Sequence, residues 1–182
     1  MAHVRASTGT ATSRNNCHPF VHGQWSFMHN GQVGGYDQFR RDADMMIPDG
    51  LYGARKGATD SEAIFLVAIA EGLDGDPRGA LERASARFIA LARAKGALPH
   101  LRMTAALSDG HRLYAVRYAT DENAPSLYYR WSATRGGMAV VSEPLEAEEG
   151  GWHEVPASSF CTFDGADVKM EEFLPCRLAS AA

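Results

Sequence analysis

The sequence lacks the features that mark several common classes of protein. Its 182 residues carry 18 Lys and Arg against 22 Asp and Glu, so there is no basic excess for nucleic acid or for a polybasic membrane contact. The longest uninterrupted apolar run, residues 63–70, is far shorter than the roughly 20 residues that span a bilayer. Residues 1–16 are polar and have no apolar core of a secretory signal. We therefore expect a cytoplasmic protein that binds neither nucleic acid nor membrane.

Common catalytic and metal-binding signatures are missing too. The sequence contains no G-x-S-x-G elbow, P-loop, dinucleotide fingerprint or H-E-x-x-H motif. It has three cysteines with no metal or redox spacing: Cys17, Cys161 and Cys176. His18 and His22 are four apart, but the proline between them disfavours a helix that presents both to a metal. Cys17 beside His18 is better explained as a loop cysteine than as a nucleophile, because nothing nearby in the sequence lowers its pKa. We expect no metal and no cofactor.

End signals predict two helices in the middle of the chain. Thr59 and Glu62 have the spacing of a capping box just before the apolar run, which predicts a buried helix to about residue 71. Asp76 and Pro77 begin a second, amphipathic helix that ends at Gly96. Between the first strand candidate, residues 25–29, and these helices, we interpret residues 37–58 as a long functional loop with one helical turn at most.

Beyond residue 100 the hydrophobic pattern alternates with a period of two, which is typical of strands. Asp109-Gly110 predicts a hairpin turn between the first pair. The predicted strands are residues 101–107, 113–118, 127–131, 138–142, 160–163 and 168–173. The order of elements predicts a single α+β domain over residues 1–182, with helices packed on an antiparallel sheet.

Three polar positions are candidates for binding or catalysis. Asn30-Gly31 follows an alternating strand and by itself favours a hairpin turn; the alternative is an oxyanion site with two donors. Arg5 alone is a strand-edge charge, or else a ligand that holds a carboxylate in a two-pronged bond. Asp60 alone is an acid that the helix dipole favours at a helix N-terminus.

Taken in order, the motifs resemble the class II glutamine amidotransferase domain, a family of N-terminal-nucleophile hydrolases, and its bacterial stand-alone branch in particular. The motifs are residues 2–8 (AHVRAST), 16–20 (NCHPF), 29–31 (HNG), 59–62 (TDSE) and 142–145 (SEPL). The resemblance covers most of the chain. It implies a four-layer α/β/β/α sandwich, incomplete at the N-terminus, which agrees with the α+β order.

The resemblance also implies an activity and roles for individual residues. The family hydrolyses the side-chain amide of glutamine and releases ammonia. By this resemblance Arg5 holds the substrate carboxylate and Asp60 meets its amine. Asn30 and Gly31 then form the oxyanion hole, and Thr8 lines the glutamine pocket. Opposite charges suit a zwitterion, and two donors suit a tetrahedral oxyanion.

One departure from the family concerns the nucleophile, which in the family is a cysteine at the mature N-terminus. The sequence begins Met1-Ala2 where the family is already inside its fold, and no cysteine falls at the motif position. We expect no family chemistry from the chain as it stands. Two hypotheses follow: an internal start, with the cysteine encoded upstream, or a non-catalytic remnant that binds glutamine or a partner protein.

The substrate class stays open at this point. Stand-alone relatives resemble both ammonia-producing amidotransferases and hydrolases that cleave γ-glutamyl bonds in small metabolites. No synthase domain is present to receive ammonia. We therefore expect glutamine or a γ-glutamyl small molecule as substrate, with either a separate acceptor or synthase protein or direct hydrolysis.

Overall fold

Two antiparallel sheets and a group of helices make up the computed structural model, which describes residue 1 and residues 13–134, 136–144 and 151–175. The larger sheet has the strand order β1-β2-β3-β4-β8-β9. Its strands are β1 (Phe20–His22), β2 (Trp25–Gln32), β3 (Arg102–Ser108), β4 (Leu113–Ala119), β8 (Ser159–Asp164) and β9 (Asp167–Glu172). The smaller sheet has the order β6-β5-β7, with β5 (Tyr128–Ser132), β6 (Gly137–Val141) and β7 (His153–Glu154).

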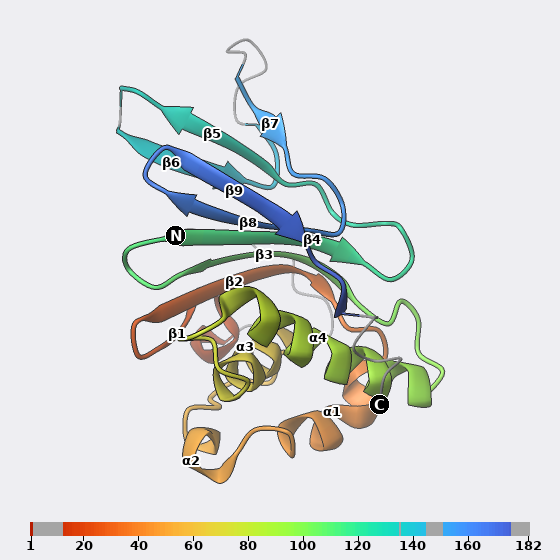
Figure 1. The fold of residues 1–182 in the computed structure, drawn as a ribbon. Coiled ribbons are helices and arrows are strands. Elements are labelled where there is room, and N and C mark those ends of the chain that lie inside the picture. The colour runs from red at the N-terminus through yellow and green to blue at the C-terminus, as the bar shows by residue number, and fades with distance from the viewer. Residues whose placement is uncertain (2–12, 135, 145–150, 176–182) are drawn as a thin grey trace.

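The helices gather on one side of the large sheet, and the small sheet lies on the other (Figure 1). They are a 3-10 turn (Arg14–Asn16), α1 (Tyr36–Asp44), α2 (Asp49–Tyr52), α3 (Asp60–Ala70) and α4 (Pro77–Ala94). Of the four layers that the resemblance implies, the described residues supply one helical layer and the two sheets. Within these residues no helix is long and apolar enough to cross a membrane.

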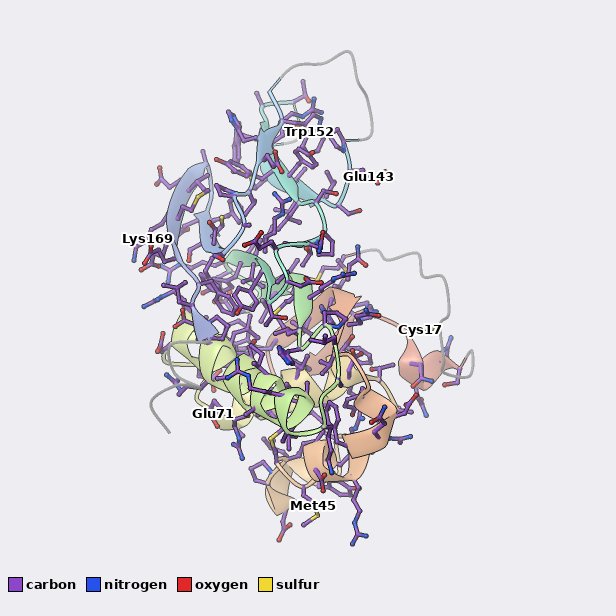
Figure 2. The ribbon with its side chains drawn as sticks, turned by 90° about the vertical axis from the view of Figure 1, so that its right-hand side faces the viewer. Cys17, Met45, Glu71, Glu143, Trp152 and Lys169 are labelled. Atoms are coloured by element: carbon purple, nitrogen blue, oxygen red, sulfur yellow. The ribbon has the colours of Figure 1, made fainter. Side chains whose placement is uncertain are left out.

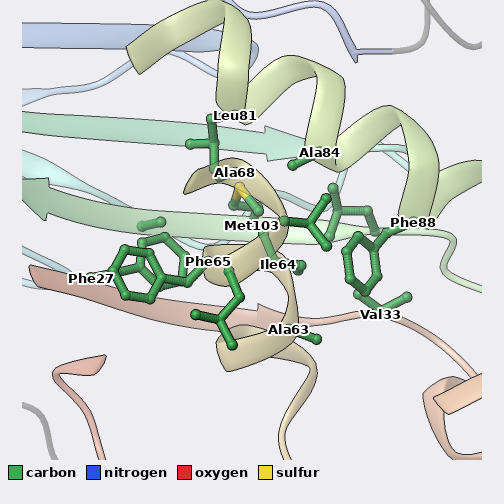
Figure 3. Close-up of a cluster of buried hydrophobic side chains, with 14 of the residues drawn as sticks. Phe27, Val33, Ala63, Ile64, Phe65, Ala68, Leu81, Ala84, Phe88 and Met103 are labelled. Carbon is green, nitrogen blue, oxygen red and sulfur yellow. The ribbon is translucent and has the colours of Figure 1, made fainter. Parts of the chain in front are cut away.

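Each face of the large sheet buries its own hydrophobic core, because side chains alternate along a strand. On β4, Tyr114, Val116 and Tyr118 join the helix-facing core, whereas Ala115 joins the core beneath the small sheet. The helix-facing core is the larger one and includes the buried side chains drawn in Figure 3. The second-sheet core consists of Ala115, Leu127, Val155, Cys161 and Phe163.

The two predicted helices are confirmed, and their N-terminal caps form as expected. The Thr59 hydroxyl accepts a hydrogen bond from the Glu62 amide at 3.2 Å, and the Asp76 carboxylate accepts one from the Gly79 amide at 2.9 Å. Helix α3 is buried over residues 61–68, as its continuous apolar run predicts. The capping box is only half formed, because the Glu62 carboxylate binds the preceding loop instead.

The strands predicted beyond residue 100 are confirmed with small shifts at their ends, and Gly110 turns the β3–β4 hairpin with φ of +90°. The interpretation of Asn30-Gly31 as a hairpin turn is wrong. Strand β2 continues through both residues to Gln32, with Asn30 opposite Thr104 and Gly31 opposite Met103 of β3. Pairing with a strand seventy residues away outweighs the local turn preference.

The interpretation of residues 37–58 as a loop is also wrong, because this segment contains most of α1 and all of α2. Helix α1 buries Tyr36, Phe39 and Ala43, whose spacing of three and four residues places them on one helix face. Polar and charged residues fill the remaining positions, and Phe39 itself departs from helical φ and ψ angles. The apolar stripe was therefore short enough to be missed.

Candidate functional site

The last residues of β2 present two candidate side chains to opposite faces of the sheet. The imidazole of His29 is buried toward the helices, whereas Asn30, the next residue, is exposed. Strand β1 pairs only with residues 25–27, so in the described part of the chain the outer edge of β2 has no strand partner at Asn30 and Gly31. Among the residues that the structure describes, this stretch of β2 therefore lies at the edge of the sheet.

Gly31 occupies a position that no other residue fills without rearrangement. Its φ is +152°, and a Cβ atom there would collide with the carbonyl oxygen of Arg102 and lie 2.7 Å from Nε2 of His29. Only glycine therefore lets β2 approach β3 closely at this point. This packing explains the glycine of the H-N-G motif independently of any chemistry.

Asp60, the first residue of α3, reaches the end of β2. One carboxylate oxygen accepts the Val33 amide at 2.8 Å, and the other accepts the Ser61 amide at 2.8 Å. The first of these bonds holds Asp60 against Val33, the residue after the end of β2 and three positions beyond Asn30. Each oxygen retains a lone pair, because a carboxylate accepts up to about four hydrogen bonds.

His29 connects the same two elements from inside the core. Its Nδ1 lies 2.8 Å from the Ser61 hydroxyl, and its Nε2 lies 3.2 Å from the Arg102 carbonyl oxygen. Burial lowers the pKa of His29 below its ordinary value, and this outweighs the nearby Asp60 charge and the bond to Arg102, which both raise it. The imidazole is therefore neutral at pH 7.

The loop before α3 is held by a buried charge network that sequence reasoning missed. Nη1 of Arg55 donates to Glu62 at 2.7 Å and to the Thr59 carbonyl at 2.8 Å, and its Nε donates to Asp44 at 3.0 Å. Its Nη2 donates to the Tyr36 hydroxyl. The Arg55 side chain is only 4% exposed. The network fixes the path of the chain into Asp60.

Glu62 completes this support by capping loop amides that would otherwise lack partners. Its two oxygens accept the amides of Lys56 and Gly57, each at 2.8 Å. The side chain of Asn16 accepts the Ala58 amide at 2.8 Å, so the segment that ends at Asn16 docks on the same loop. Arg5 and Thr8, the other predicted substrate contacts, lie outside the described residues.

The two cysteines of the described chain differ in burial. Cys17 is exposed at the margin of the molecule (Figure 2), and its thiol donates to the Ser13 carbonyl at 3.3 Å. Cys161 is buried in the second-sheet core, and burial raises its thiol pKa to about 11. Cys176 lies outside the described residues. In the described ranges no cluster of three His, Cys, Asp or Glu side chains is arranged to hold a metal.

The structure combines antiparallel sheets with helices on one face, and it places an H-N-G strand end beside a T-D-S-E helix start. Residues 1–132 match the family model of the class-II glutamine amidotransferases. This match covers well over half of the 182 residues. The chain belongs to the class II glutamine amidotransferase family.

Individual relatives agree with this assignment. The chain is 30% identical to the probable glutamine amidotransferase DUG3 of Saccharomyces cerevisiae over 88% of its own length, but it spans only 56% of the yeast protein. It is 54% identical, with a TM-score of 0.86, to a solved glutamine aminotransferase class-II domain protein from Silicibacter pomeroyi, covering 90% of this chain and 73% of that one.

A more distant solved structure shares the fold alone. Glutamine phosphoribosylpyrophosphate amidotransferase from B. subtilis is 13% identical with a TM-score of 0.64, over 94% of this chain and 34% of that one. The expected fold is therefore confirmed as a mixed α/β arrangement with antiparallel sheets, as in these solved amidotransferase structures.

Proposed function

We propose that this protein hydrolyses the side-chain amide of glutamine, or the γ-glutamyl bond of a small molecule, by the class II mechanism. The observation that carries the proposal is the hydrogen bond from the Val33 amide to Asp60, which brings the candidate amine ligand to the strand end that bears Asn30 and Gly31. The proposed oxyanion donors at the end of β2 and the proposed amine ligand at the start of α3 meet there.

Each residue has a distinct task in the reaction. The Asn30 side-chain amide and the Gly31 backbone N–H donate to the oxyanion that forms when the amide carbonyl is attacked. Asp60 binds the ammonium group of the substrate, and Arg5 binds its carboxylate while Thr8 lines the pocket. The charged contacts are present in ground and transition state alike, whereas the donors act mainly on developing charge.

The nucleophile in this proposal is a cysteine encoded upstream of Met1, at the N-terminus of the mature enzyme, with its own amine as the base. The DNA sequence before Met1 tests this directly. An in-frame extension that opens with Met-Cys supports the proposal, and an in-frame stop immediately before Met1 contradicts it. The second candidate function, a non-catalytic protein that binds glutamine or a partner, then takes its place.

Kinetic assays on the protein expressed with its upstream codons distinguish the substrates. Ammonia release from glutamine is compared with amine release from γ-glutamyl peptides, and a variant with the N-terminal cysteine changed to alanine is the control. Hydrolysis of either substrate that the control lacks supports the proposal; hydrolysis of neither contradicts it.

Binding measurements address the second candidate function. Isothermal titration of residues 1–182 with glutamine measures binding without catalysis, and Asp60→Asn is the matched variant. Glutamine binding that Asp60→Asn weakens supports a binding protein. The absence of binding at millimolar glutamine rules out the glutamine-binding version.

A further inference from the structure

Two buried residues, neither assigned a role in the proposed reaction, join the two halves of the candidate site. His29 immediately precedes the oxyanion donor Asn30, and Ser61 immediately follows the amine ligand Asp60. The His29 imidazole and the Ser61 hydroxyl lie 2.8 Å apart, although 32 residues separate them in the sequence. Both side chains are buried, with residue exposures of 3% and 5%.

The direction of this hydrogen bond follows from the other partner of the ring. Nε2 of His29 faces the Arg102 carbonyl oxygen, which only accepts, so Nε2 carries the proton of the neutral imidazole. Nδ1 is then an acceptor, and the Ser61 hydroxyl donates to it. The single hydroxyl proton is thereby used, so the longer 3.3 Å contact from Ser61 to Asp60 is not a second donation.

Packing around the ring keeps this geometry fixed. The ring of Phe27 stacks on Phe65 of α3 with centroids 5.4 Å apart, and His29 stacks beyond Phe27 at 6.3 Å. Figure 3 shows Phe27 and Phe65 together at the contact between β2 and α3. Because the imidazole is buried, little water competes for the Ser61 hydroxyl.

We propose that His29 and Ser61 are a pair of positioning residues that sets the separation between Asn30 and Asp60. This inference rests on the proposed function. The substrate spans the two residues, with its amine at one and its reacting carbonyl at the other. A fixed separation therefore selects the length of the chain between them, and it favours glutamine over asparagine, which is one methylene shorter.

Removal of the hydroxyl tests the pair in the enzyme that carries its N-terminal cysteine. Ser61→Ala is expected to lower kcat for glutamine about 10- to 100-fold, because small misplacements of reacting groups cost up to about that much. The ratio of kcat/KM for glutamine to that for asparagine is expected to fall as well. Ser61→Thr keeps a hydroxyl and is expected to restore most of both.

Ser85 provides a matched control, because it is a fully buried serine of α4 whose hydroxyl contacts the Met103 sulfur at 3.9 Å. Ser85→Ala is expected to leave kcat and the substrate ratio within about twofold of the parent protein, since only a weak bond within the core, and no bond between β2 and α3, is lost. Urea unfolding of all variants shows whether each is folded under assay conditions.

The outcomes distinguish a failure of the positioning role from a failure of the proposed function. If the parent enzyme hydrolyses neither glutamine nor a γ-glutamyl amide, the proposed function fails. If the parent hydrolyses glutamine and Ser61→Ala retains its kcat and its substrate ratio, the positioning role is overturned. It is equally overturned if Ser61→Thr fails to restore activity, or if Ser85→Ala lowers kcat as much.

Discussion

The two faces of the large sheet differ in how firmly they are held. On the helix side, the core includes wholly buried aromatic rings, and a buried arginine binds two carboxylates, a hydroxyl and a carbonyl oxygen. On the other side, the described residues of β5, β6 and β7 are half-buried or exposed, and the second-sheet core contains five buried residues. Figure 1 shows the small sheet at the end of the molecule opposite the helices.

This difference indicates that the helix side of the large sheet is the more rigid side. Asp60 and His29 both stand on the firmly held side: His29 of β2 bonds Ser61 of α3, and Asp60 of α3 accepts the amide of Val33, the residue after β2. A catalytic arrangement needs its groups fixed within a fraction of an ångström, which a packed core supplies and a half-exposed sheet does not. We therefore expect substitutions on the helix side to cost more stability than equivalent ones elsewhere.

The largest effect is expected from the buried arginine. Arg55→Met removes the partner of Glu62 and Asp44 and leaves buried negative charge uncompensated, so we expect a loss of about 3–5 kcal/mol in unfolding free energy. Lys169→Met is the control, because Lys169 is 71% exposed in its ion pair with Glu171 and such pairs contribute about 0–1 kcal/mol. Urea unfolding at pH 7 measures both; equal losses would contradict the comparison.

A smaller loss of stability is expected from a substitution at Gly31, where β2 approaches β3. Gly31→Ala places a methyl group against the Arg102 carbonyl, and the resulting strain is expected to cost about 1–3 kcal/mol. At Gly110 the φ angle is +90°, but nothing lies within 4 Å of an added Cβ. Gly110→Ala therefore measures the cost of backbone strain alone. Thermal unfolding of the two variants checks this. A Gly110 variant that is less stable than the Gly31 variant would show that crowding is not the cause.

A still smaller loss of unfolding free energy is expected when the pH is lowered. Burial lowers the pKa of His29, so the native state keeps this imidazole neutral while the unfolded chain takes up a proton near the ordinary value of 6.5. The unfolded state then binds more protons, and stability falls as pH drops below about 6.5. The slope from this group is at most about 1.4 kcal/mol per pH unit.

Comparison with His29→Gln isolates that slope from the other titrating groups. Unfolding free energies between pH 7.5 and pH 5.5 are expected to decline more steeply in the parent protein than in the variant. Parallel pH profiles would show that His29 does not remain neutral in the native state.

The elements that the sequence predicted well are those with local end signals. Thr59 and Asp76 mark the starts of α3 and α4 by their own side chains, and Asp109-Gly110 marks its hairpin without reference to the rest of the chain. Alternation of apolar and polar residues in the sequence indicated the strands beyond residue 100. The position of Asp60 at the start of α3 was likewise indicated by a local motif, whereas its role toward a substrate was implied by the family resemblance.

The features that were missed depend on contacts between distant segments. Asn30-Gly31 has the composition of a turn, and only pairing with β3 shows that it is strand. The partners of Arg55 come from α1, from the loop and from α3, so no spacing in the sequence reveals their network. Helix α1 has too few apolar residues to be recognised from the sequence pattern, although Tyr36, Phe39 and Ala43 share one face.

In the proposed mechanism, Asn30 acts on the transition state while Asp60 binds the substrate throughout. The most direct measurement is the separate determination of kcat and KM for glutamine in Asn30→Ala and Asp60→Asn, in the enzyme with its N-terminal cysteine. Asn30→Ala is expected to lower kcat about 100- to 1,000-fold with little change in KM. Asp60→Asn is expected chiefly to raise KM. An Asn30→Ala variant with the kcat of the parent enzyme would contradict the account.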